Sequence, residues 1–176
     1  MELGAMTATD YMASVEVFLS YAIKLEEEAT LRFGQLADAM DAAGNKPVGA
    51  LFRKLSDYSR LHLSDARARA GFRDVPVLLP QEYQWPEMES PETAAIWATD
   101  PLIAYEEAMD IALESEKRGY AFYKSVLDRT ADPEIKALAR EFVAEEAEHV
   151  EWLEKWISEN PLRRSGDRHR HERQES

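Results

Sequence analysis

Two histidines, His62 and His149, occupy matching positions in an internal repeat of this 176-residue sequence. The eight residues that end at His62 read LSDYSRLH, and the eight that end at His149, 87 residues later, read FVAEEAEH. Glu26 and Glu116 are related by a similar offset of 90 residues, at the ends of the segments AIKLE and ALESE. Because a duplication places equivalent residues at equivalent positions in a fold, these four side chains are predicted to meet at one site.

Glu146 adds a third glutamate to this set. It precedes His149 by three residues, so both side chains are expected on one face of a helix. A glutamate from one helix of each pair, together with a Glu-x-x-His motif, is the ligand arrangement of the di-iron carboxylate bundles. Carboxylate oxygens would neutralise and bridge two ions, and the imidazoles would supply neutral nitrogen ligands. The predicted metal ligands are therefore Glu26, His62, Glu116, Glu146 and His149.

Core packing is the alternative interpretation of these residues, because a histidine on an apolar helix face can simply be buried. A metal-free bundle therefore stays open as a second hypothesis. Tyr123 follows Glu116 by seven residues, which is two helical turns along the same face. Its hydroxyl could hydrogen-bond a ligand carboxylate or act as a catalytic redox group, and its ring could equally be part of the core.

The spacing of prolines predicts the elements that position these residues. Four long stretches carry apolar residues at three- and four-residue intervals, and any proline in them falls in the first turn, as in helices. The predicted helices span residues 10–43, 47–70, 101–129 and 133–159. Residues 72–99 hold four prolines and no sustained period, which predicts an irregular crossover between two helical hairpins. The fold class is therefore all-α, with a four-helix bundle over residues 1–161 and a disordered polar tail over 162–176.

The composition narrows the possible partners and locations. A net charge of −13 repels phosphate backbones, so no nucleic-acid partner is expected. The absence of cysteine excludes disulfides and cysteine-held iron, and fits a cytoplasmic protein without a secretory signal. No apolar run is long enough to cross a membrane. Tyr83, Trp85 and Trp97 lie in the irregular crossover, and covering so many aromatic rings predicts a homodimer.

Four segments of the chain resemble the rubrerythrin-like branch of the ferritin-like superfamily, over about residues 10–160. The segments are AIKLEEEATLRF, LFRKLSDYSRLH, ALESEKRGYAFY and EEAEHVEWL. The resemblance implies a four-helix bundle that binds two iron ions per chain and reduces peroxide or dioxygen. Matched residue by residue, it implies the same five ligands that the repeat and the Glu-x-x-His motif predict.

Three departures from the family pattern leave alternatives open. Ser59 stands where the family has a ligand glutamate, and Gly119 stands where rubrerythrins often have another. No rubredoxin module is present, so electrons would come from an external donor. With only three predicted ligand carboxylates, two Fe²⁺ ions would leave one buried positive charge unbalanced, so a single metal, zinc or manganese is also possible. Non-enzymatic iron storage and a metal-free bundle are the alternative functions.

Overall fold

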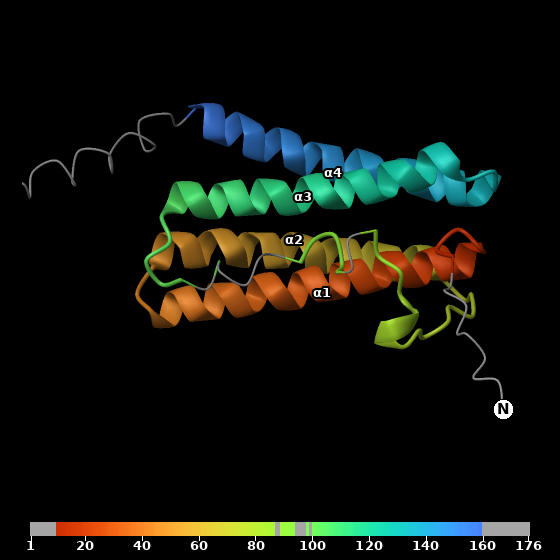
Figure 1. The fold of residues 1–176 in the computed structure, drawn as a ribbon, viewed down its shortest axis with the longest axis horizontal. Coiled ribbons are helices and arrows are strands. Elements are labelled where there is room, and N and C mark those ends of the chain that lie inside the picture. Colours follow the sequence, from red (N-terminus) through yellow and green to blue (C-terminus); the bar gives the residue numbers. More distant parts are fainter. Residues whose placement is uncertain (1–9, 87–88, 94–97, 99, 160–176) are drawn as a thin grey trace, which may run out of the picture.

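The computed structural model describes residues 10–86, 89–93, 98 and 100–159, and these form an all-helical protein (Figure 1). The α-helices are α1 (Val15–Ala42), α2 (Lys46–Ala70), α3 (Tyr105–Arg129) and α4 (Pro133–Glu159), and a short 3-10 helix, η1, spans Pro80–Glu82. No β-sheet forms in the described residues. The predicted all-α, ferritin-like four-helix bundle is confirmed. None of the helices described is both long and apolar enough to cross a membrane.

Most helix ends fall where the sequence predicts them, and local hydrogen bonds explain why. Asp132 caps α4, since its carboxylate accepts hydrogen bonds from the backbone N–H groups of Glu134 and Ile135 at 2.8 and 3.1 Å. Gly71 follows α2 with a φ of 57°, a left-handed conformation that glycine adopts without steric cost. Gly44 has a φ of 82° in the turn between α1 and α2.

The predicted starts of the first and third helices are wrong by several residues. The first helix begins at Val15 rather than at Asp10, because the Ser14 hydroxyl accepts a hydrogen bond from the Val17 N–H at 3.2 Å and caps it. The third begins at Tyr105 rather than at Pro101. Asp100 caps only a turn there, accepting from the Leu102 N–H at 2.9 Å.

The side chain of Asn45 keeps the segment before α3 out of a helical conformation. Its amide donates to the carbonyls of Pro101 and Ile103 at 3.3 and 3.0 Å. Both carbonyls are thereby paired with the α1–α2 turn. This contact also ties the segment that leads into the second hairpin to the turn of the first.

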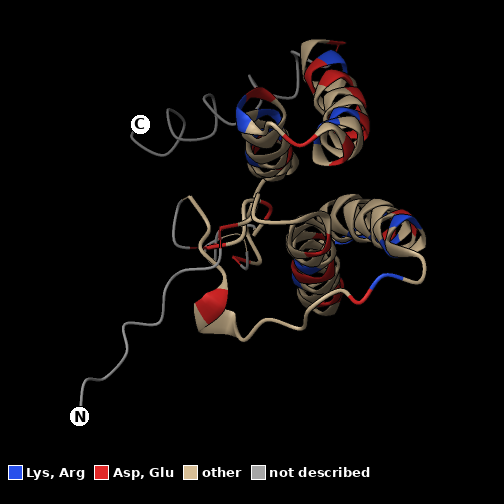
Figure 2. Cartoon of the chain, turned by 90° about the vertical axis from the view of Figure 1, so that its right-hand side faces the viewer, with Lys and Arg blue, Asp and Glu red and all other residues tan. Residues whose placement is uncertain are grey.

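The four helices are arranged as two antiparallel hairpins, α1 with α2 and α3 with α4 (Figures 1 and 2). The segment between α2 and α3 runs along one side of the bundle from one end to the other, so α3 runs parallel to α2 (Figure 1). Contacts within each hairpin are much more extensive than those between the hairpins. The predicted long crossover is confirmed.

Two separate apolar cores fill the bundle, one toward each end. One is built around Phe33 and Phe52, and the other around Phe18 and Phe142. The division runs through every long helix. On α1, for example, Leu25 belongs to one core and Ala29 to the other. The buried polar residues discussed below lie in the layer between these cores.

Part of the crossover packs against its own chain. The rings of Tyr83 and Trp85 both lie 5.0 Å from the ring of Tyr21, centroid to centroid. These two residues therefore need no second copy to cover them, which removes part of the basis for a homodimer, and the homodimer stays a prediction. Trp97 and the proposed tail over 162–176 lie outside the described residues.

We predict that Asn45→Ala lowers the free energy of unfolding by about 1–2 kcal/mol, because two carbonyls lose a hydrogen-bond donor. Urea unfolding followed by circular dichroism measures the change. Gln35→Ala, which removes an exposed amide from α1, is the matched control and should change stability by less than about 0.5 kcal/mol. Equal effects of the two substitutions would show that Asn45 does not tie the hairpins together.

Candidate metal centre

The five predicted ligands converge in the layer between the two apolar cores. They form two groups, Glu26 with His62 and Glu146, and Glu116 with His149 and Glu146. In each group, one potential ligand atom per residue lies within 4.8 Å of the others. Glu146 belongs to both groups, so it stands between two potential ion positions.

The distances show how the two groups are built. The Nδ1 atom of His62 lies 3.9 Å from Oε1 of Glu26 and 3.7 Å from Oε1 of Glu146. In the second group, Nδ1 of His149 lies 3.1 Å from Oε2 of Glu116, within hydrogen-bond distance. The repeat therefore places a Glu–His pair from each half of the chain at the same level of the bundle.

The two imidazole rings form one edge of this layer. They stack with centroids 4.7 Å apart and planes inclined by 12°, and Tyr58 stacks on the outer face of His149 at 5.2 Å. The histidine side chains are 13 % and 19 % exposed, whereas those of Glu26 and Glu146 are each 1 % exposed. Solvent therefore reaches the histidines while the carboxylates lie in the interior.

The structure shows one further buried carboxylate near the two groups, which the sequence analysis missed and which belongs to neither group. Glu92, from the crossover, is 3 % exposed. Its charge raises the pKa of Glu26, and the charges of Glu146 and Glu116 raise the pKa of Glu92 itself. No periodicity could assign it a direction, because the crossover is irregular. The one sequence signal was Gly119, a glycine at a position where the family pattern has a large side chain.

Burial and like charge act together on these carboxyls. Burial raises the pKa of Glu26, Glu92 and Glu146 well above the usual range for glutamate, and neighbouring carboxylates raise it further. Burial also lowers the pKa of His62, with His149 acting in the same direction. The environment therefore disfavours the charged forms of these four groups.

Several oxygens at the site have no hydrogen-bond partner among the described residues. They are Glu26 Oε1 and Oε2, Glu92 Oε1, Glu146 Oε2 and the Tyr123 hydroxyl. Buried polar atoms are nearly always paired, and an unpaired carboxylate oxygen is the more costly case. Free carboxylate oxygens beside imidazole nitrogens suit iron, zinc or manganese. The donor set thus fits the metal that the family pattern implies.

Tyr123 and Ser59 occupy the surroundings of this site. Tyr123 is fully buried, its ring stacks on Phe142 at 4.8 Å, and its hydroxyl lies close enough to lower the pKa of Glu26 without meeting hydrogen-bond geometry. Packing is therefore established for Tyr123, and its predicted redox role stays a prediction. Ser59 is buried and donates to the carbonyl of Leu55 at 3.2 Å, so it contributes no negative charge.

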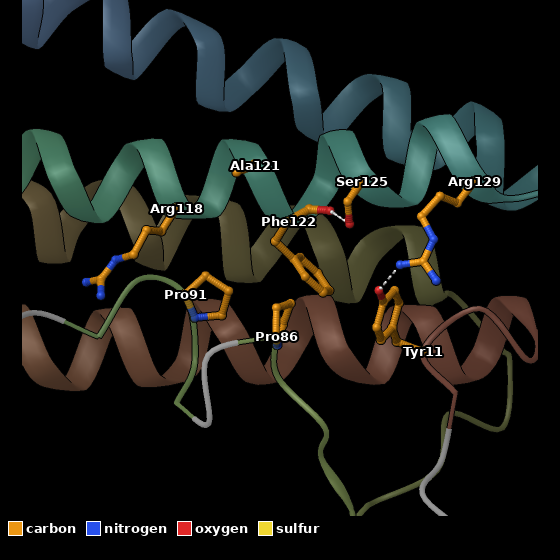
Figure 3. A pocket seen from close by; sticks show the side chains of 8 residues that line it. All are labelled: Tyr11, Pro86, Pro91, Arg118, Ala121, Phe122, Ser125 and Arg129. Atoms are coloured by element: carbon orange, nitrogen blue, oxygen red, sulfur yellow. Dashed lines mark hydrogen bonds between the residues drawn. The ribbon is translucent and has the colours of Figure 1, made fainter.

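A cavity of about 400 Å³ lies elsewhere, on the outer side of α3 (Figure 3). Its walls come from α3, from the crossover and from the segment before α1, and include Arg118, Phe122, Pro91 and Tyr11. None of the five predicted ligands lines it. The cavity and the carboxylate–histidine site are therefore separate features.

The helices and the interior site define a class of protein, the four-helix bundles with a carboxylate-rich centre. The Rubrerythrin family model matches residues 17–157, and again residues 107–175. The chain therefore belongs to the rubrerythrin family, as the sequence resemblance predicted.

A solved structure and a search of curated proteins complete the comparison. The crystal structure of an uncharacterized conserved protein from Magnetospirillum magnetotacticum is similar to this chain, with a TM-score of 0.64 and 36 % sequence identity. The match covers 83 % of this chain and 95 % of that one. The search of curated proteins found no match.

We predict that the metal-free protein becomes less stable as the pH rises. The raised pKa values of Glu26, Glu92 and Glu146 mean that the folded state holds protons which the unfolded chain has released. The lowered pKa of His62 acts in the opposite direction, but it is one group against three. This stability is fully present below the unfolded value of about 4.3 and is lost as the pH rises through the higher folded values. Urea unfolding of chelator-treated protein at about pH 5.5 and about pH 7.5 measures the loss.

Two glutamine variants on α4 control this measurement. Glu146→Gln removes one of the buried titrating groups and should reduce the pH dependence. Glu148→Gln removes an exposed carboxylate two residues away and should leave it unchanged. If Glu146→Gln has the same pH dependence as the original protein, Glu146 does not contribute to it.

Proposed function

We propose that this protein binds two iron ions between its apolar cores and uses them to reduce peroxide or dioxygen. The observation that supports this most directly is the position of Glu146, which offers a ligand atom to both carboxylate–histidine groups. A glutamate and a histidine on each side of a shared carboxylate form a donor set for a pair of ions. Membership in the rubrerythrin family supports iron as the metal.

Each of the five predicted ligands has a role in this proposal. Glu26 and His62 would hold one ion, Glu116 and His149 the other, and Glu146 both. Reducing one peroxide to two water molecules takes two electrons and two protons, and a pair of Fe²⁺ ions held by these residues would supply the two electrons. The chain has no cysteine, so it lacks the thiolates that would hold an iron donor of its own. An external electron donor is therefore part of the proposal.

The position of the histidines favours small substrates. The carboxylates lie in the interior, and among the described residues of the site the imidazoles are the most exposed. Peroxide and dioxygen are small enough to enter at the edge that these rings form. A larger substrate would require the hairpins to separate.

The metal proposal is tested by titrating chelator-treated protein with Fe²⁺ under anaerobic conditions and measuring the ions bound per chain. We expect two ions. His149→Ala should abolish tight binding of at least one, because it removes one of two nitrogen ligands, and the affinity should fall by about tenfold or more. His169→Ala, outside the described residues, is the matched histidine control. Unchanged stoichiometry and affinity in His149→Ala would make the metal interpretation wrong.

The redox proposal needs its own experiment. Protein loaded with Fe²⁺ is mixed with hydrogen peroxide or with dioxygen, and oxidation is followed optically with and without a reducing partner. We expect repeated turnover when electrons are supplied. Iron storage would instead give many ions per chain and a large assembly by light scattering. If the protein binds iron but shows neither repeated turnover nor accumulation of many ions per chain, both the redox activity and iron storage would be contradicted.

A further inference from the structure

We propose that Glu92, in the crossover, is a further metal ligand and supplies the fourth carboxylate of the site. The inference rests on the proposed metal binding and adds a residue from outside the four helices. Three predicted carboxylates leave two divalent ions with one charge unbalanced. A fourth one removes that deficit, and Ser59 does not provide it.

The burial of Glu92 is the first argument. Its side chain is 3 % exposed although it belongs to a segment that runs along the side of the bundle. Its Oε1 atom has no hydrogen-bond partner in the described part of the chain. An ionised carboxylate in that position is costly unless it is paired. Glu92 is therefore a buried carboxylate on which the charges of Glu146 and Glu116 act more strongly than that of Arg118.

The shape of α3 is the second argument. A Cβ atom on Gly119 would lie 3.0 Å from both Cγ and Cδ of Glu92, and closer still to Oε1. The absence of a side chain at residue 119 therefore makes the space that the Glu92 carboxylate fills. Gly119 lies one turn beyond Glu116 on the same helix, so this space adjoins the second carboxylate–histidine group.

The backbone around Glu92 is held in place from α3. The Ser115 hydroxyl donates to the carbonyl of Glu92 at 2.8 Å, and Arg118 donates to the carbonyl of Thr93 at 2.9 Å. The N–H of Thr93 closes a turn onto the carbonyl of Ser90 at 3.0 Å. Figure 3 shows Pro91 facing α3 between Arg118 and Phe122. These contacts fix the direction in which the side chain enters the bundle.

The charges around Glu92 are those of a ligand set. Glu146 and Glu116 act on it most strongly, and Arg118 is the one basic group described that opposes them. One guanidinium nitrogen of Arg118, Nη2, donates to the carbonyl of Thr93, and the residue also lines the cavity on α3, so the carboxylate of Glu92 is not its hydrogen-bond acceptor. A cation between Glu92, Glu116 and Glu146 would pair charges that otherwise repel one another.

The test is a titration of chelator-treated protein with Co²⁺, followed by its visible absorption and by calorimetry. Glu92→Gln keeps the size of the side chain and removes its charge. We expect it to weaken the binding of one of two ions by about tenfold or more, and to change the Co²⁺ spectrum because a ligand is lost. Glu89→Gln, an exposed glutamate of the same crossover, is the matched control and should titrate like the original protein.

A second pair of variants tests the position of Glu92 independently. Gly119→Ala adds no ligand and removes none, but its Cβ would displace the Glu92 carboxylate. It should weaken Co²⁺ binding in the original protein and have no further effect in Glu92→Ala. Circular dichroism of each variant shows whether the helices are intact.

The outcomes separate this inference from the proposed function. Two ions bound equally tightly, with the same spectrum, by the original protein and by Glu92→Gln would overturn Glu92 as a ligand and leave the metal site in place. No ion bound by the original protein would overturn both. The positioning argument would also be overturned if Gly119→Ala weakened Co²⁺ binding as much in the Glu92→Ala protein as in the original protein.

Discussion

The burial of four carboxylates close together, reinforced by the repulsion among them, is the constraint on which the structure of this bundle depends. Glu26, Glu92, Glu116 and Glu146 are each at most 4 % exposed, and they share one layer of the interior. Without a cation, such a layer can be tolerated only by taking up protons, and the raised pKa values of three of these groups express that cost. A pair of metal ions would offset the same cost through binding.

The architecture around this layer is suited to keeping the carboxylates together. Two apolar cores, one toward each end, supply the burial that stabilises the fold, and the layer between them holds the buried carboxylates and the two histidines. The hairpins pack closely within themselves and less extensively against each other. Because Glu26 and His62 belong to the first hairpin and Glu146 to the second, an ion in that group would link the two.

The crossover has a structural role beyond connecting the hairpins. Its aromatic rings cover one core through Tyr21, and its turn at residues 90–93 is held on α3 by Ser115 and Arg118. An irregular segment can direct a side chain into a bundle at an angle that no helical residue has. Gly119 is the complementary feature on the helix, because it leaves the space into which such a side chain fits.

The sequence by itself predicted the four helices, their pairing and five residues that the structure brings close together. Helical periodicity and proline spacing are local properties, and the duplication relates residues such as His62 and His149 without any knowledge of the fold. The tertiary structure decided what local patterns do not encode. It moved the start of α3 to Tyr105, because Asn45 from the other hairpin pairs with the carbonyls before it. It also brought Glu92 into the interior, since the direction of a side chain in an aperiodic segment depends on the surface against which that segment packs.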